Sequence, residues 1–164
     1  RVVEESLEHA ELSGMGTTLT LAYHLDGRVC VVHVGDSRAY IFEGDALRQI
    51  THDHTVPEDM VRRGELQPEQ VAQHPLRHVI TNVVGGIEAG VYVEAHALDV
   101  HAGDRLLLCS DGLTEMVTNE AIATVLRAES DPAAACKTLV AQANDAGGRD
   151  NITAVIVRVD PASN

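Results

Sequence analysis

Apolar and polar residues alternate along much of the first two thirds of the chain, as they do in β-strands with one buried face. Six such segments form three successive pairs: 17–25 with 28–34, 39–43 with 46–51, and 92–100 with 105–109. The first two pairs are joined by Asp26-Gly27 and Gly44-Asp45, which are typical of two-residue hairpin turns, and the third by residues 101–104. Successive hairpins predict antiparallel sheets.

Helical spacing of the apolar residues replaces this alternation after residue 117. Thr118 is expected to cap one helix, and Asp131 followed by Pro132 is expected to begin another that ends near Gly147. Residues 1–13 are predicted to contain the end of a further helix. The last segment, 151–159, is apolar on both faces, which predicts a central strand that is covered on both sides. The whole pattern predicts an α+β fold.

Composition is that of one globular domain spanning residues 1–164, with 45% hydrophobic and 23% charged residues. No apolar stretch approaches the ~20 residues that a transmembrane helix needs. The three cysteines (30, 109 and 136) lack metal-type spacing and are expected to be reduced thiols in a cytoplasmic protein. The net charge of −13 argues against nucleic acid as a partner. A phosphate ligand would meet the same repulsion unless cations lay between.

Three acidic turns at the ends of strand-like segments carry the candidate chemistry. Asp36 follows the segment 29–34, Asp111 follows 106–109, and Asp150 precedes 152–159. They lie too far apart in the sequence to form one calcium-binding loop. If the fold brings them together, their carboxylates repel unless a cation binds between them, and oxygen ligands suit Mg²⁺ or Mn²⁺. The alternative is that each Asp only stabilises its own turn.

Five motifs occur in a fixed order between residues 14 and 153. They are Gly-Met-Gly-Thr-Thr (14–18), Val-Gly-Asp-Ser-Arg-Ala-Tyr (34–40), His-Pro-Leu-Arg (74–77), Leu-Cys-Ser-Asp-Gly-Leu (108–113) and Gly-Arg-Asp-Asn-Ile-Thr (148–153). In this order they resemble the metal-dependent serine/threonine protein phosphatases of type 2C, the PPM family, in its bacterial form. The resemblance extends over nearly the whole chain, from about residue 14 to residue 159.

The resemblance implies an α/β/β/α sandwich of two antiparallel sheets, incomplete at its N-terminus, with metal ions at one end. It also implies hydrolysis of phosphoserine and phosphothreonine in proteins by a metal-activated water, with Asp36, Asp111 and Asp150 as catalytic residues. Asp111 and Asp150 would hold one of two core ions, Mg²⁺ or Mn²⁺. Asp36, assisted by Asp111 or Glu115, would hold a third, peripheral ion.

Residues 52–86 differ from the rest of the chain, because they are polar and contain two prolines and few core residues. At this position the family has a flap beside the metal site that shapes substrate choice, and His74, Arg77 and Thr81 resemble its substrate-contacting end. His78 and Asn82 depart from the family's usual Asn and Arg. The alternative is an ordinary exposed connection. The implied partners are phosphorylated proteins, substrates of a bacterial serine/threonine kinase, and the implied state is a monomer.

The family also carries an Asp-Gly-x-Gly-Gly or Asp-Gly-x-Gly-His segment upstream of residue 14, and an Arg further upstream that contacts phosphate; neither is present between Arg1 and Gly14. We therefore expect an N-terminally truncated fragment that is inactive alone, from an active parent phosphatase. Two alternatives are a catalytically silent metal-binding regulatory module and a phosphatase of anti-anti-sigma regulators. The flap-like segment and the turn at residues 35–38 argue against the second.

Two other chemistries have weaker support. A zinc site at His52-x-His54 or His74-x-x-x-His78 lacks a second Cys or His pair nearby in the sequence, so scattered surface histidines are expected. Ser37 and Ser110 do not lie in a Gly-x-Ser-x-Gly motif, so neither is expected to be a nucleophile. Ser110 is expected to support its neighbour Asp111.

Overall fold

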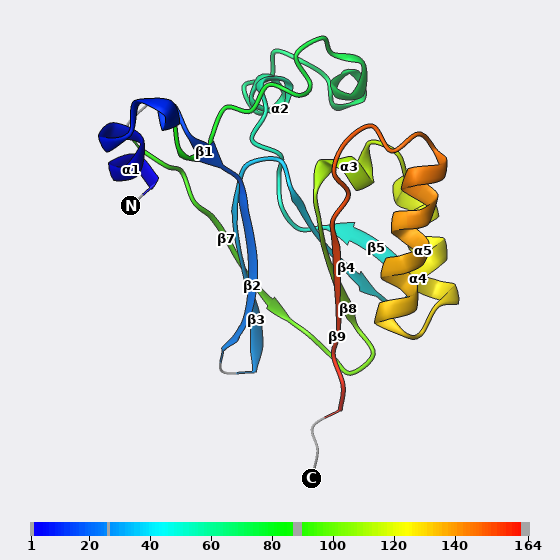
Figure 1. Ribbon diagram of the computed structural model, residues 1–164. Helices are drawn as coiled ribbons and strands as arrows, with labels where there is room; N and C mark the ends of the chain where they lie inside the picture. The colour runs from blue at the N-terminus through cyan, green and yellow to red at the C-terminus, as the bar shows by residue number, and fades with distance from the viewer. Residues whose placement is uncertain (1, 26, 87–89, 162–164) are drawn as a thin grey trace.

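The computed structural model describes residues 2–25, 27–86 and 90–161 (Figure 1). Its elements are α1 (Val2–Glu8), η1 (Ala10–Leu12), β1 (Gly16–Thr17), β2 (Leu19–Leu25), β3 (Arg28–Val34), β4 (Arg38–Glu43), β5 (Ala46–Gln49), α2 (Val56–Arg62), η2 (Pro68–Gln73), β6 (Val84–Gly85), β7 (Glu94–Asp99), β8 (Arg105–Cys109), α3 (Asp111–Thr114), α4 (Asn119–Ala128), α5 (Pro132–Asp145) and β9 (Ala154–Arg158). No helix in these ranges is long and apolar enough to cross a membrane.

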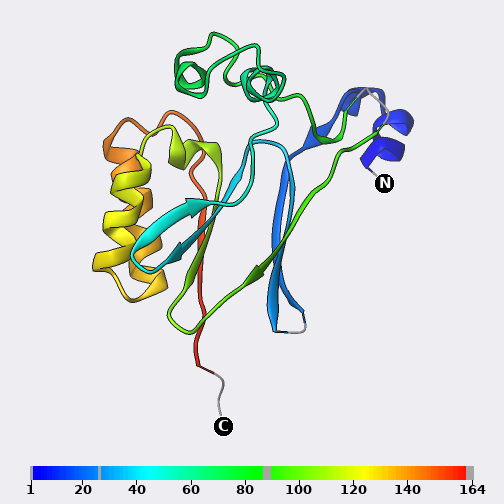
Figure 2. The ribbon, with the colours of Figure 1, turned by 180° about the vertical axis from the view of Figure 1, so that it is seen from behind.

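The strands form two main sheets, both antiparallel. One has the order β2-β3-β7 and the other β5-β4-β8-β9, while β1 and β6 make a short separate pair. Helices α4 and α5 cover the outer face of the four-stranded sheet, as the two opposite views show (Figure 1, Figure 2). The prediction of an α+β fold with antiparallel sheets and flanking helices is confirmed.

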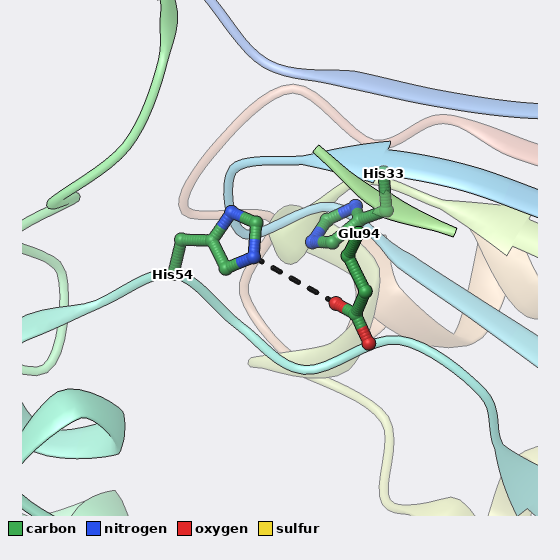
Figure 3. Close-up of side chains that lie close together, drawn as sticks. All are labelled: His33, His54 and Glu94. Carbon is green, nitrogen blue, oxygen red and sulfur yellow. Dashed lines mark ion pairs between the residues drawn. The ribbon is translucent and has the colours of Figure 1, made fainter. Parts of the chain in front are cut away.

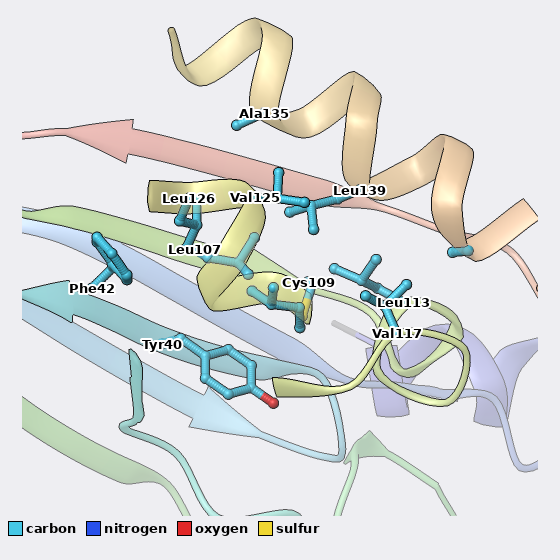
Figure 4. Close-up of a cluster of buried hydrophobic side chains, with 12 residues drawn as sticks. Tyr40, Phe42, Leu107, Cys109, Leu113, Val117, Val125, Leu126, Ala135 and Leu139 are labelled. Atoms are coloured by element: carbon cyan, nitrogen blue, oxygen red, sulfur yellow. The ribbon is translucent and has the colours of Figure 1, made fainter. Parts of the chain in front are cut away.

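Strand β4 is buried on both faces, which explains its continuous apolar run. Ala39 and Ile41 face the three-stranded sheet and pack with Val31 in the core between the sheets. Tyr40 and Phe42 face the other way, into a cluster beneath α4 and α5 that also contains the residues drawn in Figure 4 from β8 and both helices. The four-stranded sheet is therefore the central layer of the described residues.

The outer face of β2 is less covered. Leu19, Leu21, Tyr23 and Leu25 share this face and are between 44% and 52% exposed. Within the described ranges, α4 and α5 form the helical layer on the four-stranded sheet. Three of the four layers of the α/β/β/α sandwich implied by the resemblance are therefore present: the two sheets and one layer of helices.

Local turn and cap chemistry was predicted correctly. The hairpin β2–β3 is present, although Asp26 of its turn lies outside the described residues. Gly44 and Asp45 both have positive φ angles, 52° and 66°, as a two-residue hairpin turn requires. Thr118 and Asp131 cap α4 and α5 by accepting backbone N–H bonds.

The predicted third hairpin is wrong. Strand β7 pairs with β3, whereas β8 pairs with β4 and β9, so residues 101–104 carry the chain from one sheet to the other. The turn itself forms, since the Asp104 carboxylate accepts the His101 backbone N–H at 2.7 Å. A turn motif fixes a reversal of direction but not the sheet that the next strand joins.

The prediction of a central, doubly covered β9 is also wrong for the described residues. Strand β9 is an edge strand, and its apolar residues Val155 and Val157 are 48% and 50% exposed. Only its other face, with Ala154 and Ile156, packs against the core beneath α5.

Candidate active site

The turn between β3 and β4 places Asp36 at one end of the sheets. Gly35 has a φ angle of 114°, and a Cβ there would overlap the Thr18 side chain. The Gly35 N–H donates to His54 Nδ1 at 3.0 Å, and its carbonyl accepts the His54 backbone N–H at 2.7 Å. Because the turn is held on both sides, the direction in which Asp36 leaves the backbone is fixed.

Asp111 lies at the same end of the four-stranded sheet. Arg38 at the start of β4 pairs with Cys109 at the end of β8, so the residues beyond these two positions emerge side by side. Burial, and then the negative charge of Asp111, raise the pKa of Asp36 to about 6. A hard divalent cation between the two carboxylates would offset their repulsion and the burial of Asp36, so these residues fit a metal site.

The turn that carries Asp150 is packed against the Asp111 turn. Ser110 Oγ donates to the Asn151 carbonyl at 3.0 Å and accepts the Thr153 N–H at 3.0 Å. The Asp150 side chain is exposed and accepts the N–H of the next residue, Asn151, at 2.7 Å. Ser110 was expected to support Asp111, and in the structure it does so by joining the two acidic turns.

A cavity of about 250 Å³ opens between these turns and the segment 52–86. Its lining includes three predicted acidic residues, Asp36, Asp111 and Glu115. It also includes cationic or titratable groups from elsewhere in the chain: Arg77, His78 and Arg149. Acidic groups beside cationic groups in one cavity suit a ligand that contains both metal ions and phosphate.

Three predicted site residues do not line this cavity. Asp150 is next to the lining residue Arg149, but its carboxylate is engaged in its own turn. His74 accepts the Leu76 N–H at 3.2 Å, and Thr81 donates its backbone N–H to the His54 carbonyl at 2.8 Å. Glu115 lines the cavity, and its carboxylate is 2.7 Å from His78 Nδ1.

Residues 52–86 lie at the sheet end that carries Asp36 and α3 (Figure 1). Their base is tied to the β3–β4 turn by a bidentate ion pair, in which Arg38 donates to Asp53 at 2.7–3.1 Å. Val56 N–H also donates to the Val79 carbonyl at 3.0 Å, which closes the segment on itself. The segment therefore forms one wall of the cavity.

Sequence reasoning missed Asp53, Arg149 and a cluster around Glu94. Arg149 adjoins Asp150, and that neighbourhood was a usable signal, whereas nothing in the sequence marked Asp53. Among the described residues, the groups of three potential metal ligands within 4.8 Å of one another contain Glu94 and histidines. Asp36, Asp111 and Asp150 do not form such a group.

Comparisons with known proteins agree with this geometry. The sequence profile described as protein phosphatase 2C matches residues 2–143. A serine/threonine phosphatase, Stp, of Listeria monocytogenes serotype 4b (strain F2365) is 35% identical over 159 residues, which cover 97% of this chain and 63% of the relative. The chain thus spans less than two thirds of the length of the curated relatives that it matches first.

Solved structures give the same picture. The crystal structure of the Mycobacterium tuberculosis serine/threonine phosphatase PstP/Ppp has a TM-score of 0.87 and 35% sequence identity, covering 98% of this chain and 67% of that one. The catalytic domain of the phosphatase PstP in complex with two manganese ions has a TM-score of 0.82 and 34% identity, covering 98% and 66%.

Proposed function

Because this chain belongs to the protein phosphatase 2C family, we propose that it forms part of a metal-dependent phosphatase that hydrolyses phosphoserine and phosphothreonine in proteins. The observation that carries the proposal is the cavity that Asp36 and Asp111 line together with Arg77 and Arg149, and in which burial and then the charge of Asp111 raise the pKa of Asp36. The similarity to serine/threonine phosphatases over almost the whole chain supports it.

We propose Mg²⁺ or Mn²⁺ as the cofactor, with two core ions and a third, peripheral one. The relative solved with two manganese ions and the all-oxygen character of the predicted ligands support this choice. Asp111 and Asp150 would contribute to the core site. Asp36, with Asp111 or Glu115, would hold the peripheral ion, and Glu115 would then have to give up its contact with His78.

When bound, two such cations supply an activated water and stabilise the charge that develops on the phosphoryl oxygens and the leaving oxygen. The chain's own residues contribute binding and orientation. Arg77 and Arg149 line the cavity, where their guanidinium groups would donate to phosphate oxygens. Residues 52–86 act as the flap, and the contact between Arg38 and Asp53 holds its base in place. His74 and Thr81 do not line the cavity, so they would influence substrate binding by maintaining the conformation of the flap.

We propose phosphorylated proteins as substrates, made by a bacterial serine/threonine kinase, and a monomeric phosphatase in the cytoplasm. The names of the relatives support the substrate class. A net charge of −13 argues against nucleic acid as a substrate.

Activity is tested in a protein that joins the 164 residues to the upstream Asp-Gly-x-Gly-Gly segment of a relative. We expect Mn²⁺- or Mg²⁺-dependent hydrolysis of a phosphothreonine peptide that stops on addition of EDTA and is lost in Asp111→Asn. The matched control is Asp145→Asn, an exposed residue at the end of α5, which should retain activity. Hydrolysis that persists in EDTA, or in Asp111→Asn, would contradict the proposal.

A further inference from the structure

Three side chains that do not line the cavity just described, those of His52, Glu94 and His96, meet in a second cluster. His52 Nδ1 lies 2.8 Å from Glu94 Oε1, and His96 Nε2 lies 2.6 Å from the same oxygen. All three possible ligand atoms are within 4.8 Å of one another. His52 comes from the connection after β5, whereas Glu94 and His96 come from β7.

The fold holds these groups in place before any ligand arrives. Glu94 and His96 are alternate residues of β7, so their side chains leave the same face of the strand. The pairing of Glu94 with His33 in β3 fixes the register of β7, and with it the positions of Glu94 and His96 along the sheet. The backbone N–H of His52 donates to Glu94 Oε2 at 3.1 Å, which orients the carboxylate and leaves Oε1 toward the two imidazoles.

We propose that His52 Nδ1, His96 Nε2 and Glu94 Oε1 form a binding site for a transition-metal dication of the Zn²⁺ type. Two imidazoles and one carboxylate are a ligand set that zinc favours, whereas Mg²⁺ prefers oxygen ligands alone. In a tetrahedral site with bonds of about 2.1 Å, neighbouring donor atoms lie about 3.4 Å apart. In the metal-free site the contacts of 2.6 and 2.8 Å are hydrogen bonds in which both imidazole nitrogens donate to Oε1. Metal binding would release these two protons and lengthen the contacts to about 3.4 Å.

A buried and unsatisfied group beside this cluster provides independent support. His54 is 4% exposed, and its Nε2 has no hydrogen-bond partner among the described residues. This nitrogen points at Glu94 Oε2 from 3.7 Å (Figure 3). Its other nitrogen, Nδ1, accepts N–H groups from Gly35 and Asn82, so the proton of the neutral ring is on Nε2. A buried N–H without an acceptor is costly.

A metal ion on Glu94 Oε1 would give this N–H a function. Ligating carboxylates are commonly hydrogen-bonded through their second oxygen, and such contacts strengthen the site. His54 is placed to donate to Oε2 or to a water on the metal. We therefore interpret the unsatisfied N–H of His54 as a group that would support the metal site once an ion is bound.

His33 and His54 themselves do not fit as ligands, although they also lie close to Glu94. His33 Nε2 donates to two backbone carbonyls, of Gly35 at 2.9 Å and of His52 at 3.1 Å, whereas His52 and His96 donate to the carboxylate oxygen that is itself a proposed ligand. The Nδ1 of His33 is bonded to Thr20 Oγ1 at 2.9 Å. With both nitrogens of His33 engaged and a proton on His54 Nε2, the two buried rings support the cluster from behind.

The proposed site opens into a cavity of about 540 Å³ that is lined by all three ligands, by His54, and by Arg62 and Tyr92. Three protein ligands at the edge of a cavity leave one coordination position for water or a small anion. The Asp36–Asp111 cavity is a different one, although Asp53 lines both.

The test uses the 164-residue chain with Asp36→Asn and Asp111→Asn, which removes two of the four predicted ligands of the phosphatase ions, including Asp111, which is assigned to both the core and the peripheral ion. Titration with Co²⁺, read by visible absorption, and with Zn²⁺, read by calorimetry, should each show one equivalent bound. His52→Ala and His96→Gln should each weaken the affinity at least about tenfold. His101→Gln is the matched control, since His101 is exposed and lies 3.7 Å from a carboxylate oxygen of Asp104.

The proposal is overturned if no Co²⁺ or Zn²⁺ binds to the Asp36→Asn, Asp111→Asn chain, or if binding in the His96→Gln variant equals that in His101→Gln. The side chain of His52 is 79% exposed, so His52→Ala should fold normally and keeps the test valid if His96→Gln proves unstable. Binding that is unchanged in His52→Ala would equally reject the site.

Discussion

The backbone carbonyl oxygen of Asn151 occupies the space that a Cβ atom on Gly112 would need. Gly112 does not have a positive φ angle, so its small size matters here for packing and not for backbone conformation. Together with the bonds made by Ser110 Oγ, this contact holds the Asp111 and Asp150 turns against each other. The lack of a side chain at Gly112 thus allows the two turns that carry predicted metal ligands to lie in contact.

Gly112→Ala should destabilise the chain by about 1–3 kcal/mol, because the added methyl group forces the two turns apart. Urea unfolding measures this change. Gly44→Ala is the comparison, since Gly44 has nothing within 4 Å of an added Cβ and would suffer only from its φ angle of 52°. The packing argument fails if Gly112→Ala is no less stable than the unchanged chain.

Asp36→Asn should stabilise the metal-free chain at pH 7. Raising the pKa of Asp36 from 3.8 to about 6 corresponds to at most ~3 kcal/mol, and screening of a partly exposed group reduces this to ~1 kcal/mol. Because this pKa is raised, the folded state holds the proton more tightly, and stability falls as the pH rises from 3.8 to about 6.

Thermal unfolding in EDTA at pH 7.5 compares Asp36→Asn with the unchanged chain and with Asp145→Asn. The control should change stability by less than ~0.5 kcal/mol. A lower stability of Asp36→Asn than of the control would show that Asp36 is not held in an unfavourable charged state.

The buried histidines should make stability depend on pH in the opposite direction. Burial lowers the pKa of His33, and burial together with His33 lowers the pKa of His54. Below about pH 6.5 the unfolded chain therefore takes up protons that the folded chain excludes, and stability falls as the pH falls. We expect a lower unfolding midpoint at pH 5.5 than at pH 7.5, measured with Asp36→Asn so that Asp36 does not offset the effect.

The variant His54→Gln should show a smaller difference between the two pH values, whatever its absolute stability. Burial by itself would raise the pKa of Glu94, but hydrogen bonds from His52 and His96 outweigh burial and hold this pKa below its usual range. Glu94 therefore affects the pH dependence of stability only at lower pH. An unchanged pH difference in His54→Gln would exclude His54 as a source of the effect.

Asp150→Ala and Asp36→Ala should separate the core ion from the peripheral ion in the protein completed with a relative's N-terminal segment. Loss of a core ligand removes several kcal/mol of transition-state stabilisation, so Asp150→Ala should lower kcat at least about a hundredfold. Asp36→Ala should reduce phosphopeptide turnover less and retain much of the metal binding. The roles are wrongly assigned if Asp36→Ala abolishes metal binding while Asp150→Ala keeps near-normal turnover.

Short-range features of the fold were predictable from the sequence alone. Gly44-Asp45 specifies a two-residue turn, and Thr118 and Asp131 specify helix starts, because each acts on backbone atoms only a few residues away. The five ordered motifs also identified the family, which the comparisons confirm. Asp36, Asp111 and Glu115 were predicted as neighbours on that basis, and one cavity contains all three.

Which strands become neighbours was decided only by tertiary structure. The turn at residues 101–104 predicted a hairpin, yet β7 joins β3 and β8 joins β4, because burial of both faces of β4 and β8 outweighs local pairing. Because β7 joins β3, Glu94 and His96 lie next to His52, which is 42 residues from Glu94 in the chain. The fold thus forms a histidine cluster at a position where sequence spacing had argued against a zinc site. The spacing of residues in the sequence reveals ligands that lie on one helix, strand or loop. A site built from several elements depends on the pairing of distant strands, which leaves no local pattern in the sequence.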